Sequence, residues 1–155
     1  MSNGLPPGFS RETTIRRDDE GRWFHDGILV TNPKVAQAFD RWIDVDPGGR
    51  FILKNDINWA FVTVEGAPMT VISARVGPQG ITLWLSDDRC ESLNPDTVRQ
   101  GPDGRVYCSV RDGRLTARFS RRAVLDLAPA LEEDGSLRVG DRVISVPIVE
   151  NPLIS

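Results

Sequence analysis

Residues 59–75 read WAFVTVEGAPMTVISAR, and this stretch decides how we interpret the rest of the chain. Two short apolar runs, residues 59–64 and 69–74, lie on either side of residues 65–68. Short runs rich in Val, Thr, Phe and Ile that are interrupted by Gly and Pro are typical of strands. The sequence therefore predicts two strands around a tight connection near the middle of the chain, with a similar local pattern once on each side.

Composition predicts a globular protein. The 155 residues are 39% apolar and 26% charged, which suits one ordinary core or two small lobes. No apolar run approaches the roughly 20 residues of a membrane-spanning helix, so we expect no membrane association. The first 20 residues lack the apolar segment of a secretory signal, which predicts a cytoplasmic protein. Cys90 and Cys108 have no CxxC spacing, so we interpret them as small apolar residues rather than a disulfide or a metal site.

The charge pattern bears on binding partners. A net charge of −3 argues against a dedicated binder of nucleic acid duplexes or anionic membranes. Seventeen of the nineteen basic residues are Arg, and six of them lie between Arg105 and Arg122. Arg is favoured where a carboxylate or a phosphate is bound through two hydrogen bonds. Codon usage combined with a solvated face is the alternative explanation for this enrichment.

The first half of the chain predicts an arm followed by an α+β lobe. Residues 1–13 are rich in Gly and Pro and are expected to form a flexible N-terminal arm, and residues 14–85 the first lobe. Asp26-Gly27 between β-forming residues indicates a two-residue hairpin turn. Asn32 followed by Pro33 predicts a capped helix start, and the helix should end by Asp44.

The second half repeats this pattern after a predicted connecting loop at 86–103. In the second lobe, residues 104–155, Asp112-Gly113 follows one β-forming run, Ser120 stands at a cap position, and Pro129 should kink or end the helix. A further hairpin is expected around Gly140. Each half thus reads as strand, Asp-Gly turn, strand, capped helix and strands, which predicts two tandem related α+β lobes. The alternative is that hairpin followed by helix arises twice without duplication.

Three motifs together resemble an uncharacterised bacterial family, domain of unknown function 1285 (DUF1285). The motifs are Gly21-x-Trp23, Val64-Glu65-x-Ala67-Pro68 and Val110-Arg111-x-Gly113-x-Leu115-x-Ala117-Arg118-x-x-Arg121, and the match spans residues 15–148. Two positions depart from the family pattern, which is expected to have Asp at Gly66 and Phe at Met69. The first departure removes one of two neighbouring acids beside Glu65.

The resemblance implies two packed lobes, of which the second is broadly similar to a pleckstrin-homology fold. It also implies a cleft between the lobes that binds a small molecule or acts in signalling. The family carries no established activity, so the resemblance implies a fold and not a reaction.

No catalytic, cofactor or metal signature is present in the sequence. His25 is the only histidine and sits beside a predicted turn, with no Ser or Cys motif to pair with it. Asp44-x-Asp46 only faintly resembles a calcium loop, because Gly48 replaces an oxygen ligand. The Gly-rich turn at 77–80 fits no phosphate-binding fingerprint. We therefore expect neither a cofactor nor a metal.

Glu65 and three arginines are the main candidate ligand-binding residues. Glu65 ends an apolar strand, where a carboxylate either faces solvent in a turn or pairs with an arginine of the second half. Arg111 lies at a turn and Arg118 late in a strand. Arg121 begins a helix, a place that suits an anion better than a cation. Solvation of these side chains is the alternative.

Two apolar residues complete the candidate site. Pro68 belongs to the same motif as Glu65, and Trp23 is expected either in the core, like most tryptophans of such runs, or lining a cleft. The sequence favours a non-enzymatic binding module for a small anionic metabolite or nucleotide, held between the lobes. A protein-interaction adaptor is the alternative, through strand edges. An enzyme is the least favoured.

Overall fold

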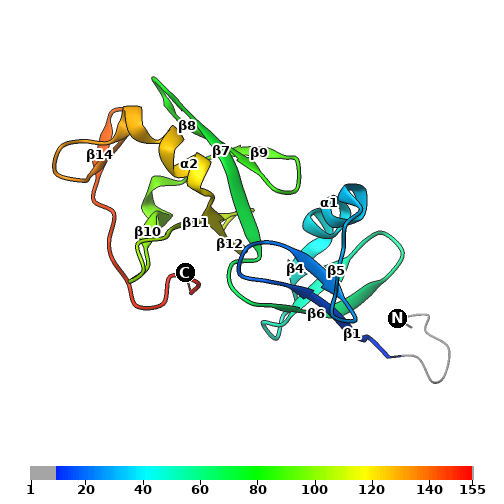
Figure 1. Ribbon diagram of the computed structural model, residues 1–155. Coiled ribbons are helices and arrows are strands. Elements are labelled where there is room, and N and C mark those ends of the chain that lie inside the picture. Colours follow the sequence, from blue (N-terminus) through cyan, green and yellow to red (C-terminus); the bar gives the residue numbers. More distant parts are fainter. Residues whose placement is uncertain (1–9, 155) are drawn as a thin grey trace. The chain divides into compact units, whose positions relative to one another are not determined.

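The structure is a computed structural model that describes residues 10–154, and the chain divides into two compact units, Met1–Pro68 and Met69–Ser155. Each unit contains one six-stranded sheet and few helices (Figure 1). The α+β class and the presence of two lobes are therefore confirmed. The N-terminal arm predicted for 1–13 lies mostly outside the described residues, and a strand already begins at Glu12.

The first unit is built from two groups of three strands with a helix between them. Its elements are β1 (Glu12–Arg17), β2 (Trp23–His25), β3 (Ile28–Leu29), α1 (Pro33–Trp42), β4 (Ile43–Val45), β5 (Phe51–Lys54) and β6 (Trp59–Val64). The sheet order is β3-β2-β1-β6-β5-β4. All neighbours are antiparallel except β1 and β6, which run parallel at the centre.

Local chemistry sets the turns and the helix of this unit as the sequence predicts. His25 pairs with Ile28, so the loop between β2 and β3 consists of Asp26 and Gly27 alone. Their φ angles of 53° and 76° are those that a two-residue hairpin turn requires. The side chain of Asn32 accepts a hydrogen bond from the Lys34 amide and caps α1. The helix ends at Trp42, within the predicted limit.

The second unit repeats the two groups of three strands and adds a separate hairpin. Its elements are β7 (Met69–Gly77), β8 (Gly80–Leu85), β9 (Cys90–Ser92), the 3₁₀ helix η1 (Pro95–Thr97), β10 (Arg99–Gln100), β11 (Val106–Val110), β12 (Leu115–Phe119), α2 (Arg121–Asp126), the 3₁₀ helix η2 (Ala128–Ala130), β13 (Leu137–Val139) and β14 (Arg142–Ile144). The sheet order is β10-β11-β12-β7-β8-β9, with β12 and β7 parallel at the centre.

The predicted lobe boundaries are corrected by the strand pairing. The two strands of the 59–75 stretch fall in different sheets, because β6 pairs with β1 and β5 whereas β7 pairs with β12 and β8. Residues 65–68 are thus the link between the units and not the turn of a hairpin. The first unit ends at Pro68 rather than at 85, and the predicted loop at 86–103 contains β9, η1 and β10.

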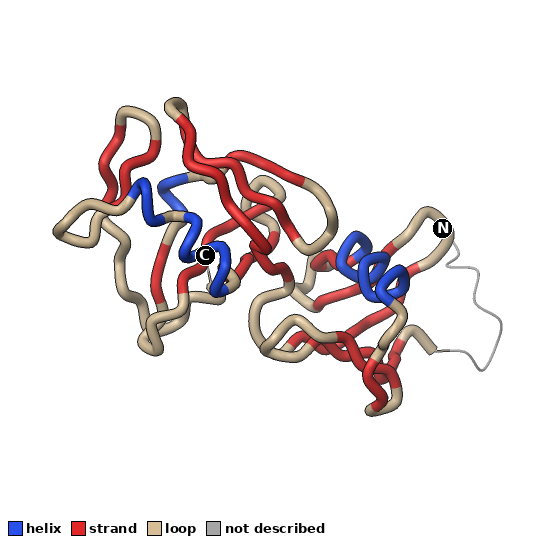
Figure 2. Tube along the Cα trace, turned by 45° about the horizontal axis from the view of Figure 1, so that its top comes forward, coloured by secondary structure: helices blue, strands red, loops and turns tan. Residues whose placement is uncertain are grey.

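The two sheets are related by their strand order. Figure 2 shows their strands in red and the few helices in blue. In each, two three-stranded meanders are joined by a parallel pair between the first and the last strand. The hairpin–helix pattern occurs twice, but α1 lies between the two meanders of its unit and α2 follows the last strand of its own. The repeated local pattern therefore occupies different places in the two sheets. The pleckstrin-homology-like character of the second lobe stays a prediction.

One turn of the second unit differs from its counterpart in the first unit, and the second helix ends as expected. Val110 pairs with Leu115, so the turn around Asp112-Gly113 has four residues, whereas the Asp26-Gly27 turn has two. The helix α2 stops at Asp126, before Pro129, and a 3₁₀ turn follows, which confirms the predicted early stop.

No helix of the described part is long and apolar enough to cross a membrane. Both cysteines are free thiols.

Candidate functional site

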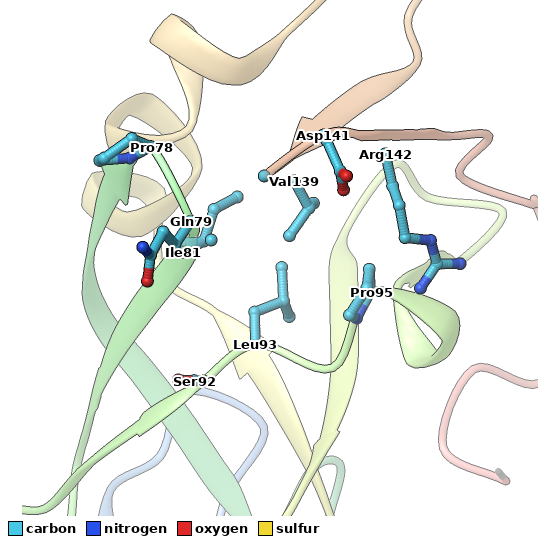
Figure 3. A pocket seen from close by; sticks show the side chains of 11 residues that line it. Pro78, Gln79, Ile81, Ser92, Leu93, Pro95, Val139, Asp141 and Arg142 are labelled. Atoms are coloured by element: carbon cyan, nitrogen blue, oxygen red, sulfur yellow. The ribbon is translucent and has the colours of Figure 1, made fainter.

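A pocket of about 490 Å³ lies in the second unit, between the β7–β8 turn, the segment after β9 and the β13–β14 hairpin (Figure 3). Pockets that bind small ligands are usually 300–1,000 Å³ in volume, so this one is large enough for a metabolite. Its lining comes from three separate parts of the chain: Pro78, Gln79, Gly80, Ile81, Ser92, Leu93, Pro95, Val139, Gly140, Asp141 and Arg142.

The inner wall of the pocket is apolar. Ile81, Leu93 and Val139 are 2%, 5% and 7% exposed, and their side chains approach one another in Figure 3. Strand alternation places Ile81 and Val139 on the buried faces of β8 and β13. The hairpin tip is held close, because a Cβ atom added at Gly140 would lie 3.1 Å from the carbonyl oxygen of Gln79. Gly140 also has a φ of 65°, which favours glycine.

The rim of the pocket carries charges of both signs. Nη2 of Arg142 donates a hydrogen bond of 2.7 Å to Oδ1 of Asp96, and the two side chains are 53% and 69% exposed. The hydrogen bond to Asp96 and the charge of Asp141 raise the pKa of Arg142. An ion pair this exposed is weak, so a ligand can compete with Asp96 for the guanidinium.

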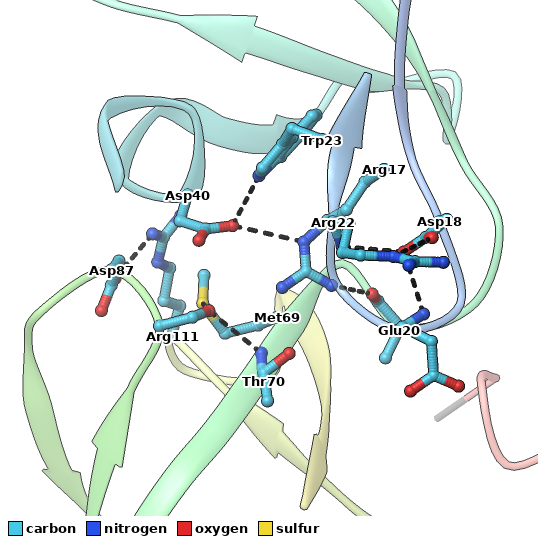
Figure 4. A network of polar contacts seen from close by, with 12 residues as sticks. Arg17, Asp18, Glu20, Arg22, Trp23, Asp40, Met69, Thr70, Asp87 and Arg111 are labelled. Atoms are coloured by element: carbon cyan, nitrogen blue, oxygen red, sulfur yellow. Dashed lines mark hydrogen bonds and ion pairs between the residues drawn. The ribbon is translucent and has the colours of Figure 1, made fainter. Parts of the chain in front are cut away.

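Trp23, a predicted site residue, lies in a buried polar network of the first unit. Its indole Nε1 donates to Oδ1 of Asp40 at 2.9 Å, and the same oxygen accepts from Nε of Arg17 at 3.2 Å (Figure 4). Trp23 and Arg17 are each 2% exposed. Nη1 of Arg17 also donates to the carbonyl oxygen of Ala67 at 2.7 Å. The network therefore joins β1, β2 and α1 to the link that follows β6, where Pro68 is also buried.

Glu65 pairs with an arginine of its own unit. Its Oε1 lies 2.9 Å from Nη1 of Arg16, and the two side chains are 49% and 33% exposed. The guanidinium of Arg16 stacks over the ring of Phe24 with its central carbon 4.2 Å from the ring centroid. Glu65 is thus a partly exposed member of an ion pair at the end of β6.

The three predicted arginines lie on consecutive segments: Arg111 in the turn between β11 and β12, Arg118 in β12 and Arg121 at the start of α2. Nη2 of Arg111 lies 2.8 Å from Oδ2 of Asp87, a carboxylate that is 1% exposed, and the Arg111 amide donates to Glu91 (Figure 4). Arg118 lies near the other end of β12, about 10 Å along the strand from Leu115. Arg121 is exposed at the start of α2, which has only six residues. The backbone therefore does not gather these three residues at one point.

The other residue types that suggested chemistry are separated as well. His25 has a side chain that is 61% exposed, and its nearest acid is Asp26 in the neighbouring turn position. Among residues 10–154, no group of three or more His, Cys, Asp or Glu side chains is arranged to hold a metal. Burial raises the pKa of the Cys108 thiol to about 12, helped by Glu91 and opposed by Arg99.

Sequence reasoning missed the pocket and two buried arginines. Arg17 and Arg99 are 2% and 7% exposed, although arginine is rarely buried to this extent. Arg17 lies in the segment ETTIRR, where nothing distinguishes it from the neighbouring Arg16. The pocket depends on the approach of the Gly140 turn to Gln79, and the predicted turn at Gly140 was its one visible sequence signal.

Comparison with solved structures supports the fold. A crystal structure of a DUF1285 family protein from Silicibacter pomeroyi DSS-3 superposes with a TM-score of 0.71 and 21% identity, over 87% of this chain and 80% of that one. A second, from Shewanella baltica OS155, gives a TM-score of 0.63 and 17% identity over 77% and 94% of the two chains. No family model and no curated protein matches the sequence. The resemblance to DUF1285 is confirmed, and at these identities it concerns the fold alone.

Proposed function

We propose that this protein is a binding module whose small-molecule ligand occupies the 490 Å³ pocket of the second unit. The pocket itself is the observation that carries the proposal, because an apolar wall with a few polar groups at its rim is the usual form of a ligand site. The role is binding rather than catalysis, since the single histidine is exposed and the pocket lining contains neither histidine nor cysteine. We include in this proposal the signalling role that the family resemblance implies, with the ligand of the pocket as the signal.

The lining favours one kind of ligand. An apolar body would pack on Ile81, Leu93 and Val139, and an acceptor group would replace Asp96 at the Arg142 guanidinium. Asp96 and Asp141 flank this guanidinium and repel additional negative charge. Within the anionic class that the sequence favours, the rim therefore suits a monocarboxylate better than a nucleotide with several phosphates.

Thermal unfolding with a panel of apolar carboxylates and nucleotides tests the proposal. A ligand at 100 times its dissociation constant adds about 2.7 kcal/mol of stability. For a chain of this size each kcal/mol raises the midpoint by about 2–4 °C. We expect a monocarboxylate to stabilise the protein more than a nucleotide triphosphate does.

Variants of one edge strand provide a matched control. Ser92 lines the pocket and Cys90, two residues earlier in β9, does not, and both side chains are exposed. Ser92→Trp should abolish the thermal shift by filling the pocket, whereas Cys90→Trp should retain it. Arg142→Met should weaken the binding of carboxylates more than that of uncharged ligands. Arg138→Met, in the same hairpin, should leave carboxylate binding unchanged. A shift that survives Ser92→Trp would rule out this pocket.

An adaptor function is the second candidate, and the edge of the first sheet favours it. Both residues of the terminal strand β3 are apolar and exposed, Ile28 at 72% and Leu29 at 43%. Exposed apolar edge strands can pair with a segment of another protein. Under this function, Ile28→Lys should abolish stoichiometric pull-down of a partner. Ile57→Lys, at a loop position that is 92% exposed, should leave the pull-down unchanged.

A further inference from the structure

Arg99 in β10 is a buried cation of the second unit with four hydrogen bonds. It is 7% exposed. Its Nε donates to the carbonyl oxygen of Pro152 at 2.7 Å, and Nη1 donates to the carbonyl oxygen of Thr97 at 2.8 Å. The remaining contacts are with hydroxyl groups: Nη1 lies 3.2 Å from Oγ of Ser109, and Nη2 lies 3.0 Å from Oγ1 of Thr116.

All four acceptors are neutral. Within residues 10–154 no carboxylate bonds to the Arg99 guanidinium, in contrast to Arg17 and Arg111, which each contact a buried aspartate. Removing a charge from water without an opposite charge costs several kcal/mol. The same burial lowers the pKa of Arg99. An oxoanion is therefore a better partner for this guanidinium than the carbonyl groups it now contacts.

The segment that covers Arg99 is residues 147–154, which we call the strap. Pro147 accepts a hydrogen bond from the Gln100 amide and Val149 donates to the Gln100 carbonyl, both at 2.8 Å, so the strap runs parallel to β10. Further along the strap, the Leu153 carbonyl accepts from the Thr116 hydroxyl at 3.2 Å.

The strap is fixed mainly by these backbone hydrogen bonds. Its apolar side chains are largely in water: Ile148 is 72% exposed, Leu153 40% and Ile154 69%, and only Pro152 is buried. Little apolar area is lost if the strap detaches, so detachment is inexpensive compared with opening the core.

We propose that Arg99, Ser109 and Thr116 form an oxoanion-binding site that the strap occupies with its carbonyl groups until a phosphate or carboxylate group replaces them. The guanidinium offers a planar pair of N–H donors, and the two hydroxyl groups offer one donor each. Binding and detachment are coupled, because the carbonyl oxygens of Pro152 and Leu153 use the same donors as the incoming anion. Detachment of the strap therefore depends on whether the anion is bound.

Amide hydrogen exchange of the full-length protein during titration with inorganic phosphate tests this coupling. We expect the Val149 amide, which bonds to Gln100, to exchange at least tenfold faster at saturating phosphate. The Ser86 amide, which donates to the Thr70 carbonyl at 2.9 Å and lies outside both the strap and the pocket, should keep its rate. Sodium chloride at equal ionic strength should have no effect. Acetate in place of phosphate distinguishes a carboxylate ligand from a phosphate ligand.

Two variants make the assignment specific. Thr116→Val preserves the shape of the side chain and removes its hydroxyl, and should raise the phosphate concentration for half-maximal effect about tenfold. Thr82→Val, on β8, should match the unmodified protein. Arg99→Met should abolish the phosphate-dependent acceleration of Val149 exchange. If that variant does not fold, the response of Thr116→Val tests the site.

Two results would overturn the site. The first is an exchange rate of the Val149 amide that saturating phosphate leaves unchanged, which would mean that Arg99 holds the strap permanently. The second is an acceleration of exchange that is equal in the unmodified protein and in Thr116→Val. The pocket variant Ser92→Trp should leave the phosphate response intact, so this inference and the proposed function fail separately.

Discussion

The carboxylate Oδ1 of Asp40 lies 2.9 Å from the indole nitrogen of Trp23 and accepts its hydrogen bond in the interior of the first unit. The same oxygen accepts from Arg17, so one atom of α1 neutralises a buried cation and satisfies a buried indole. Because Arg17 also donates to Ala67, this aspartate indirectly positions the link that begins after β6.

Replacement of Asp40 by Ala should therefore be strongly destabilising. Removing one partner of a buried ion pair leaves an uncompensated charge, and we expect a loss of about 3–5 kcal/mol in the free energy of unfolding. Urea denaturation followed by tryptophan fluorescence measures this loss. Glu12→Ala is the matched control, because the Arg50–Glu12 pair is more than half exposed and its removal should cost far less stability. Equal losses in the two variants would contradict a structural role for the buried pair.

Gly66 should not tolerate the aspartate that the family pattern is expected to have there. Its φ is 130°, and a Cβ atom at this position would lie 2.7 Å from Oδ1 and 3.4 Å from Cα of Asp19. Gly66→Asp adds backbone strain, a close contact and a like charge, and we expect a loss of about 2–3 kcal/mol in unfolding free energy.

Comparison with Gly49→Ala separates the contact from the strain. Gly49 has a φ of 88°, and nothing lies within 4 Å of a Cβ atom added there. Gly49→Ala should therefore lose only the stability that backbone strain costs, about 1 kcal/mol. Gly66→Ala should be more destabilising than Gly49→Ala in the same urea titration. If the two variants lose equal stability, Asp19 moves aside without cost.

Much of the local structure could be predicted because it depends on neighbouring residues. The Asp26-Gly27 turn needs positive φ at both positions, and the cap at Asn32 needs only a side-chain oxygen two residues before an amide. The strand at 59–64 follows from its composition alone. In each case the cause lies within a few residues of the effect.

Partner choice could not be predicted in the same way. An apolar run indicates that a strand exists, but not which strand it bonds to, and β6 and β7 bond to β1 and β12 at distances of about 50 residues in sequence. The pocket and the burial of Arg99 could not be predicted for the same reason. The pocket joins three distant segments, and the burial of Arg99 depends on residues 147–154, for most of which the sequence predicts no element.

Glu65→Gln should have little effect on stability. The Glu65–Arg16 pair is between one third and one half exposed, so screening by water and salt limits its contribution to less than about 1 kcal/mol. Chemical denaturation at 20 mM and 500 mM NaCl checks this, and the difference between Glu65→Gln and the unmodified protein should shrink at high salt. A loss above 2 kcal/mol would indicate that Glu65 serves in a tighter network than the ion pair alone.

The two thiols should differ sharply in reactivity. Cys90 is exposed and Cys108 is fully buried, so a disulfide reagent at pH 8 should modify one thiol rapidly in the native protein and two after denaturation. Cys90→Ser should leave no rapid reaction. Fast modification of two thiols in the native state would show that β11 opens readily.

The same burial predicts a loss of stability in alkaline solution. The folded-state pKa of Cys108 is raised from 9.0 to about 12, so above pH 9 the unfolded chain releases a proton that the folded chain keeps. The unfolded state then binds fewer protons, and the free energy of unfolding falls by about 1.4 kcal/mol per pH unit between pH 9 and about 12. Cys108→Ala lacks this titration, so its stability relative to the unmodified protein should rise by roughly 2 kcal/mol from pH 8 to pH 10.5. A constant difference across that range would mean that the thiolate forms without unfolding, and that β11 is less tightly packed around Cys108 than the structure shows.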